Sequence, residues 1–177
     1  MNRNPFAWPF RVQFLFGLLA CTALLAYAIF EQFHMGIEPC PKCIFQRIAF
    51  IVMAAFFLVG AVHDPRVVGR RVYAVLVAIA AVVGAVVAVR HVYVQLAPPD
   101  PLMGGCGPGL NYLIQSFPIG EAIKKAFMAS SDCSEINWTF LGLTMPAWAL
   151  IWFVFLGLGA LWAGFRLRAD TTFARRV

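Results

Sequence analysis

Four long apolar runs divide the chain. The predicted spans cover about residues 12–30, 44–62, 72–92 and 143–165. A helix of about 19 residues is about 28 Å long, which matches the hydrocarbon core of a bilayer. Only 12% of the residues are charged, whereas a soluble domain carries about 25%. We therefore predict an all-α polytopic membrane protein, a bundle of four transmembrane helices that forms a single domain over residues 1–177.

The first apolar run also contains two sequences that resemble cleavage signals. Residues 26–28 (AYA) are similar to a signal-peptidase site, and residues 18–21 (LLAC) are similar to a bacterial lipoprotein box. Cleavage at either would remove the first span. The run continues to Phe30 and is too long for the apolar core of a signal peptide, so we predict an uncleaved anchor in which Cys21 is a packing residue. A soluble bundle is disfavoured because few segments have a polar face.

The arginine residues indicate the orientation of the predicted bundle. Nine of the fourteen Lys and Arg residues fall on one side of the four spans, and cytoplasmic segments are enriched in this way. We therefore predict a bacterial inner-membrane protein with both termini cytoplasmic and two periplasmic loops, residues 31–43 and 97–140. The net charge of +6 is then a topology signal, and no nucleic-acid partner is expected. The nine residues are Arg3, Arg11, Arg66, Arg70, Arg71, Arg166, Arg168, Arg175 and Arg176.

Four of the five cysteines lie in the two predicted periplasmic loops. Disulfides persist in this oxidising compartment, so Cys106 and Cys133 are equally consistent with a structural and a redox-active pair. Cys40 and Cys43 would close too short a loop to stabilise the fold, and such pairs more often cycle between dithiol and disulfide. A four-cysteine zinc site is disfavoured because Cys106 and Cys133 are 27 positions apart. Haem attachment would need a His at position 44, so no metal is predicted.

The residues around the first cysteine pair favour a thiolate. Pro39 and Pro41 disfavour a helix upstream, so we expect the helix to begin near Cys43, where the positive end of the helix dipole stabilises negative charge. Lys42 adds positive charge. Arg47 lies four residues after Cys43, on the same helix face and about 6 Å deeper. An arginine at this depth needs a partner or must extend to the headgroups, and the sequence leaves both open.

Arg90 and His91 end the third span on the same side as Arg47. Taken alone, Arg90 is consistent with an interfacial anchor, and His91 is consistent with an interfacial histidine whose hydrogen bonds are satisfied. Beside a reactive thiol, however, these hydrogen-bond donors suit an acceptor whose oxygens gain negative charge on reduction. A quinone dissolved in the bilayer has this chemistry, so we predict a quinone cofactor.

The second periplasmic loop has two parts. Residues 97–109 consist almost entirely of Pro, Gly and small side chains and cannot form a core, so Cys106 should be exposed on a flexible arm. Residues 119–129 have one apolar and one charged face, which predicts a short interfacial helix. This helix would hold Cys133 near the membrane, within reach of Cys40. An ordinary solvated surface helix would give the same geometry.

These features together resemble the bacterial disulfide bond formation protein B (DsbB) family over essentially the whole chain. A lone CxxC would not be specific, but the combination is. It comprises the CxxC-Ile motif of residues 40–44 with Arg47, the loop pair Cys106 and Cys133, His91, and the sequence NWTFLGLTMPAW at residues 137–148.

The resemblance implies an enzyme, a quinone-dependent protein-disulfide oxidoreductase with four catalytic cysteines. It would reoxidise a DsbA-like periplasmic thiol oxidase and pass two electrons to ubiquinone or menaquinone in the membrane pool, and so indirectly to the respiratory chain. By resemblance, Cys106 would form the mixed disulfide with the partner. Cys133 would pair with Cys106 at rest and exchange with Cys40.

The quinone-binding residues implied by the resemblance are Cys43, Arg47 and His91. Two other hypotheses compete with this assignment. Vitamin K epoxide reductases also combine a four-helix bundle with a CxxC beside a quinone, but their loop cysteines precede the CxxC, whereas here they follow it. A membrane scaffold with two structural disulfides would have no use for Arg47 just below Cys43.

Overall fold

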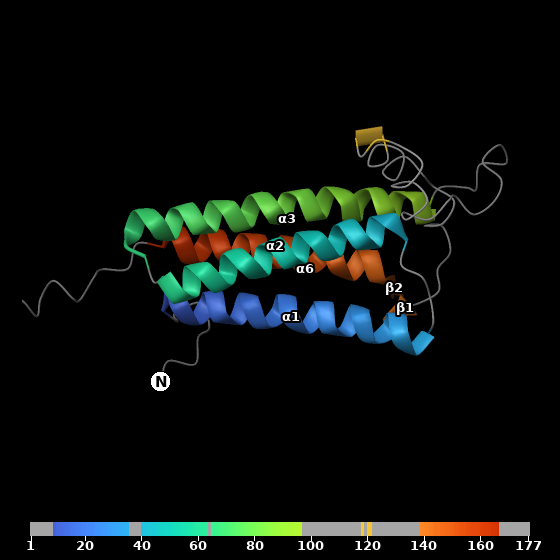
Figure 1. The fold of residues 1–177 in the computed structure, drawn as a ribbon, viewed down its shortest axis with the longest axis horizontal. Helices are drawn as coiled ribbons and strands as arrows, with labels where there is room; N and C mark the ends of the chain where they lie inside the picture. The colour runs from blue at the N-terminus through green and yellow to red at the C-terminus, as the bar shows by residue number, and fades with distance from the viewer. Residues whose placement is uncertain are drawn as a thin grey trace, which may run out of the picture.

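The computed structural model contains four long helices and one short hairpin (Figure 1). It describes residues 9–35, 40–63, 65–96, 118, 120–121 and 139–166. In chain order the elements are α1 (Phe10–Met35), α2 (Pro41–His63), α3 (Val67–Leu96), β1 (Thr139–Phe140), β2 (Leu143–Thr144) and α6 (Met145–Phe165).

All four helices are long and apolar enough to cross a membrane, which confirms the four-helix polytopic bundle. Each packs on its neighbours in the ring α1–α2–α3–α6, and α6 closes the ring against α1. The expected spans lie within these helices, except that the fourth helix starts later than predicted. The interfacial helix predicted at 119–129 falls mostly outside the described residues. Only residues 120 and 121 of it are described, both as helix, so it stays a prediction.

The bundle is apolar outside as well as inside. Large hydrophobic side chains such as Ile79, Val82 and Leu158 are exposed on its outer surface, where a bilayer would cover them. Hydrocarbon offers no hydrogen bonds to the backbone, so a spanning segment must satisfy its own amides, as these helices do. The apolar outer surface and the helical backbone are therefore both explained by a hydrocarbon surrounding.

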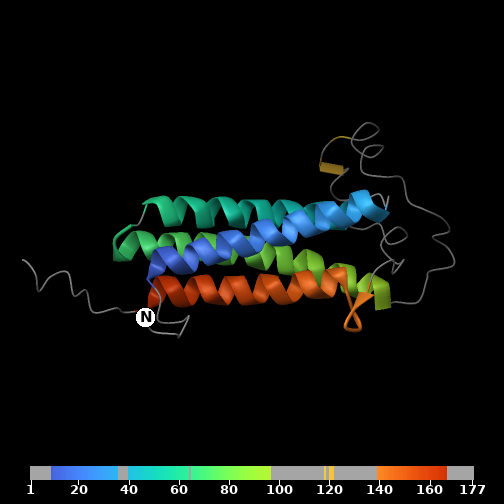
Figure 2. The same ribbon diagram turned by 90° about the horizontal axis from the view of Figure 1, so that it is seen from below.

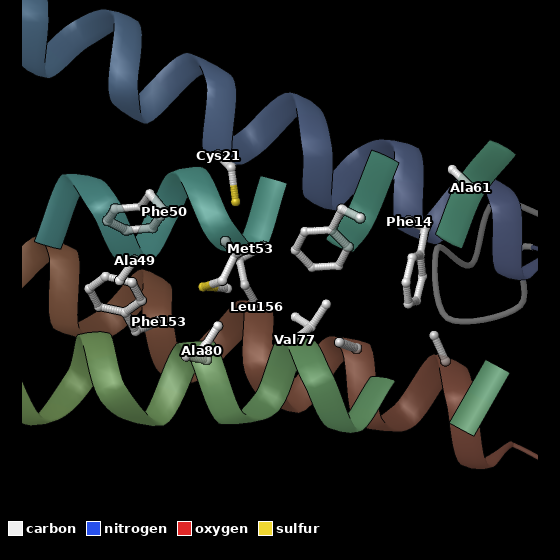
Figure 3. Packing of buried hydrophobic residues seen from close by; sticks show 14 of the residues in the cluster. Phe14, Cys21, Ala49, Phe50, Met53, Ala61, Val77, Ala80, Phe153 and Leu156 are labelled. Atoms are coloured by element: carbon white, nitrogen blue, oxygen red, sulfur yellow. The ribbon is translucent and has the colours of Figure 1, made fainter. Parts of the chain in front are cut away.

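The core lies where the four helices meet (Figure 3). Phe14 and Cys21 from α1, Met53 from α2 and Phe153 from α6 are all fully buried in one cluster. The Phe153 ring stacks on Phe50 with centroids 4.1 Å apart. Cys21 is therefore a packing residue and lies within the bundle, away from the ends where the other cysteines were predicted.

Arginine side chains connect the helices at one end of the bundle. The Arg11 Nε donates a hydrogen bond to the Ala61 carbonyl, 3.0 Å away, and so ties the start of α1 to the end of α2. The Arg70 and Arg71 guanidiniums lie over the rings of Phe10 and Phe165, at 5.5 and 5.7 Å from the ring centroids. The start of α3 is thereby fixed against α1 and α6. This arginine end is opposite to the end that carries the CxxC motif (Figure 1).

The β1–β2 hairpin lies at the end of the bundle that carries the CxxC motif and directly precedes the fourth helix. Its strands pair antiparallel around Leu141 and Gly142, which adopt φ of 53° and 78°. A two-residue hairpin turn requires such positive φ angles, and glycine adopts them without strain. Because residues 139–144 form this hairpin (Figure 2), α6 begins at Met145 and not at the predicted position 143. The Thr144 hydroxyl donates to the Gln95 side-chain oxygen at 2.8 Å and so joins the hairpin to α3.

A glycine-to-alanine pair tests the packing of α3 on α6. A Cβ at Gly84 would meet the Phe153 ring at 2.4 Å, and that ring is held against Phe50. Gly84→Ala should therefore destabilise the bundle by about 1–3 kcal/mol through overpacking. Gly159→Ala, with nothing within 4 Å, is the control and should be neutral or slightly stabilising. Thermal unfolding midpoints in detergent measure both, and equal midpoints would contradict the described packing.

Candidate functional site

The site is built on the first turn of α2. The helix begins at Pro41, two residues before the expected start near Cys43, because proline is well tolerated at the first helical position. Cys40 takes the capping position. Its carbonyl accepts the Ile44 amide at 3.2 Å, and its sulfur accepts the Cys43 amide at 3.4 Å. The Cys40 sulfur therefore receives a backbone N–H at the positive end of the helix.

The two sulfurs of the motif lie side by side. The Cys40 Sγ and Cys43 Sγ atoms are 3.2 Å apart, and both residues are half-buried. A disulfide bond brings two sulfurs to about 2.0 Å, so only a small side-chain movement separates the two redox forms. The motif can thus gain and lose a disulfide without rebuilding the helix.

His91 from α3 completes a group of three potential donors. Its Nε2 atom lies 3.8 Å from the Cys40 sulfur, and its Nδ1 atom lies 3.3 Å from the Gln46 side-chain nitrogen. His91 is 3% exposed and Gln46 is 6% exposed. The donor atoms of Cys40, Cys43 and His91 all lie within 4.8 Å of one another, close enough to hold a metal ion.

Gln46 was not anticipated from the sequence. It follows Cys43 by three residues and therefore lies on a neighbouring part of the same helix face. The sequence did contain a signal for this role, because Gln46 is a polar residue within an apolar span. Its side chain bonds the ring of His91 and so fixes the orientation of the imidazole beside Cys40.

Arg47 has its partners on α1. Its guanidinium donates to the Gln32 side-chain oxygen and to the Ala28 carbonyl, the latter at 3.0 Å. The sequence left open whether this arginine is partnered or extends to the headgroups, and these bonds show that it is partnered. His91, by contrast, reaches from α3 to Cys40 and Gln46, whereas Arg47 lies on α2 itself and turns toward α1.

The two remaining cationic residues near the motif differ in burial. Lys42, which the sequence predicts to add charge beside the thiols, is 0% exposed. Arg90 is exposed at the surface of α3. A lysine side chain is therefore enclosed at the head of α2, in the same turn as the two sulfurs. Cys106 and Cys133 lie outside the described residues, and their predicted roles stay predictions.

Comparisons with known proteins agree with this architecture. The sequence profile of the family described as "Disulfide bond formation protein DsbB" matches residues 10–163. "Disulfide bond formation protein B" of Xanthomonas axonopodis pv. citri (strain 306) is 55% identical over 169 residues, 95% of this chain and 98% of the relative. The protein of the same name from Xylella fastidiosa (strain 9a5c) is 46% identical over 164 residues, 92% of this chain and 94% of the relative. The chain therefore belongs to the DsbB family and is a disulfide-forming oxidoreductase of the membrane.

Proposed function

We propose that the protein is a thiol:quinone oxidoreductase of the bacterial inner membrane. It reoxidises a DsbA-like periplasmic thiol oxidase and delivers the electrons to ubiquinone or menaquinone. The observation that carries this proposal is the pair of sulfurs, 3.2 Å apart at the end of a membrane-length helix, with a buried imidazole 3.8 Å from one of them. A dithiol at this position can exchange with a protein on one side and donate electrons within the membrane.

The orientation follows from charge. Arg11, Arg70 and Arg71 lie at one end of the bundle and the CxxC motif lies at the other. Because cytoplasmic segments are rich in Lys and Arg, the arginine end faces the cytoplasm. The thiols then face the periplasm, the compartment in which disulfides persist.

The cysteines transfer the disulfide in four exchanges. The partner's thiolate attacks Cys106 in the Cys106–Cys133 disulfide, and Cys133 leaves as the thiolate. Cys133 then attacks Cys40, which breaks the Cys40–Cys43 bond and leaves Cys43 as the thiolate. The partner's second thiolate displaces Cys106 and closes the partner's disulfide, and Cys106 attacks Cys133, which re-forms their bond and releases Cys40. Each exchange forms one S–S bond and breaks one, so the two electrons of the partner dithiol finally reside on Cys40 and Cys43.

The described residues fit a quinone beside Cys43. Cys43 is half-buried, and Arg47 lies one helical turn further along α2. A quinone supplies the acceptor for two electrons and two protons. In a water-poor site, the fixed guanidinium stabilises negative charge as it develops on sulfur or oxygen.

His91 and Gln46 control the proton at Cys40. The imidazole Nε2 lies 3.8 Å from the Cys40 sulfur, close enough to exchange a proton with it, and the Gln46 amide holds the ring from its other nitrogen. The amide of Cys43 also donates to the Cys40 sulfur, which stabilises a thiolate there. Cys40 is thereby kept ready to re-form its bond with Cys43.

A trapping experiment tests the first exchange. Cys133→Ala leaves Cys106 as a free thiol and removes the thiol that would resolve a mixed disulfide. The Cys106 thiolate should therefore attack the disulfide of an oxidised partner and hold it as a covalent complex. Non-reducing electrophoresis with a candidate periplasmic oxidase in its disulfide form measures the complex. Cys21→Ala, which removes a thiol buried within the bundle, is the control and should trap none. Trapping that survives loss of Cys106 and requires Cys43 would contradict the order of exchanges.

Steady-state quinone reduction tests the role of Arg47. Arg47→Gln should slow reduction about 30- to 1,000-fold, the equivalent of about 2–4 kcal/mol of lost charge stabilisation. Arg47→Lys should recover only part of the rate, because an ammonium lacks the planar fork of the guanidinium. Exchange with the partner's thiol, measured separately, should stay near the wild-type rate.

Two matched variants separate charge stabilisation from other roles of Arg47. Arg90→Gln removes an exposed charge from α3 and should leave quinone reduction unchanged. Gln32→Leu removes one hydrogen-bond partner of Arg47 but keeps its charge, and should slow reduction much less than Arg47→Gln. Wild-type rates and quinone affinity in both Arg47 variants would mean that Arg47 only anchors α2 to α1.

A further inference from the structure

Cys40, Cys43 and His91 are arranged like the ligands of a zinc ion. The two sulfurs are 3.2 Å apart, the Cys40 sulfur is 3.8 Å from His91 Nε2, and all three donor atoms lie within 4.8 Å of one another. Zn–S bonds of about 2.3 Å and Zn–N bonds of about 2.0 Å place tetrahedral ligands about 3.5–3.8 Å apart. The S–S distance is about 0.6 Å shorter than its tetrahedral value, and the Cys40–His91 distance is about 0.3 Å longer. The distance between the Cys43 and His91 donor atoms is at most 4.8 Å. Side-chain movements of about 1 Å would therefore complete the geometry.

The donor types select a soft or borderline cation. Two thiolates and one imidazole suit Zn²⁺, whereas Mg²⁺ and Ca²⁺ prefer oxygen ligands. Sites with two cysteines, one histidine and an open fourth position are known for zinc. Both cysteines are half-buried, so they are partly accessible to a hydrated ion.

Gln46 can orient His91 for metal binding. A histidine that binds metal through Nε2 carries its proton on Nδ1, and that proton needs an acceptor. The Gln46 side-chain nitrogen lies 3.3 Å from Nδ1, and rotation of the amide by half a turn presents its oxygen there instead. The partner that metal-bound histidines require is thus already in place and already buried.

We propose that the reduced protein binds one Zn²⁺ through Cys40, Cys43 and His91, and that formation of the Cys40–Cys43 disulfide expels it. Binding releases the protons of the two thiols to solvent. A two-electron acceptor, either the quinone of the proposed function or an added chemical oxidant, takes two electrons from the sulfurs as they join. Neither sulfur then retains thiolate character, and Zn²⁺ leaves unchanged in charge. The metal site therefore exists only in the reduced form of the protein.

Zinc would act as an inhibitor that competes with reoxidation. An ion held by both sulfurs prevents electron donation from Cys43 and bond formation by Cys40. This consequence rests on the proposed function, whereas metal binding itself does not. A test without quinone or partner therefore separates the two.

Cobalt is a suitable probe because thiolate-bound, tetrahedral Co²⁺ has characteristic visible and near-ultraviolet absorption. Full-length protein in detergent carries Cys106→Ala and Cys133→Ala, so that only the site and the buried Cys21 supply thiols. The reduced protein should bind one equivalent of Co²⁺ with thiolate charge-transfer and tetrahedral bands, and Zn²⁺ should displace it. The disulfide form should show neither band. Equal binding by the disulfide form, or octahedral cobalt without charge transfer, would overturn the proposal.

Variants of the two buried polar residues test the third ligand. In the same background, Gln46→Leu should weaken Co²⁺ binding about 10- to 100-fold, and His91→Ala should weaken it further. Gln46→Glu should tighten binding, because a carboxylate accepts the Nδ1 proton more strongly than an amide. Tyr93→Ala, at an exposed position on the same helix, is the control and should bind as the parent does. If His91→Ala binds Co²⁺ as tightly as the control, the site has only two ligands and the proposal is wrong.

Discussion

The start of α2 determines the geometry of the site. Pro41 occupies the first helical position, which places Cys40 at the cap and fixes the direction of every later side chain on the helix. Cys43 then comes to lie beside Cys40, Gln46 turns toward α3, and Arg47 turns toward α1. A helix that began near Cys43 would lose the bond from the Cys43 amide to the Cys40 sulfur.

The rest of the bundle holds α3 where His91 can meet that turn. Small residues let α3 and α6 approach closely: Gly84 lies under the Phe153 ring, and a Cβ at Gly164 would be 2.4 Å from Ala74. Close approach through small residues is the usual way for helices to pack in lipid, where no hydrophobic force drives them together. The bond between Thr144 and Gln95 fixes the last turn of α3 at the same end. The position of His91 thus depends on packing far from the thiols.

Apolar runs and motif spacing were sufficient to predict four spans, the basic end and the location of the CxxC pair. The partners of the polar residues were not predictable in this way. Each helix is apolar on all sides, so the sequence does not show which face turns toward which neighbour. The bonds from Gln46 to His91 and from Arg47 to Gln32 depend on that rotation. The burial of Lys42 follows from tertiary contacts, and the hairpin before α6 follows from local turn geometry. The hydrophobic pattern of the sequence predicts neither.

In the proposed mechanism, the same properties would serve electron donation and expose the site to metal. The helix amide and the neighbouring imidazole would stabilise a thiolate at Cys40, and the thiolate is also the form that binds soft cations. Removing that stabilisation would protect against metal but would slow disulfide exchange. The remaining protection would be kinetic, because the disulfide form offers no thiolate. On this proposal, rapid reoxidation of Cys40 and Cys43 would serve both turnover and exclusion of metal, and the site would be most vulnerable when its electron acceptor is scarce.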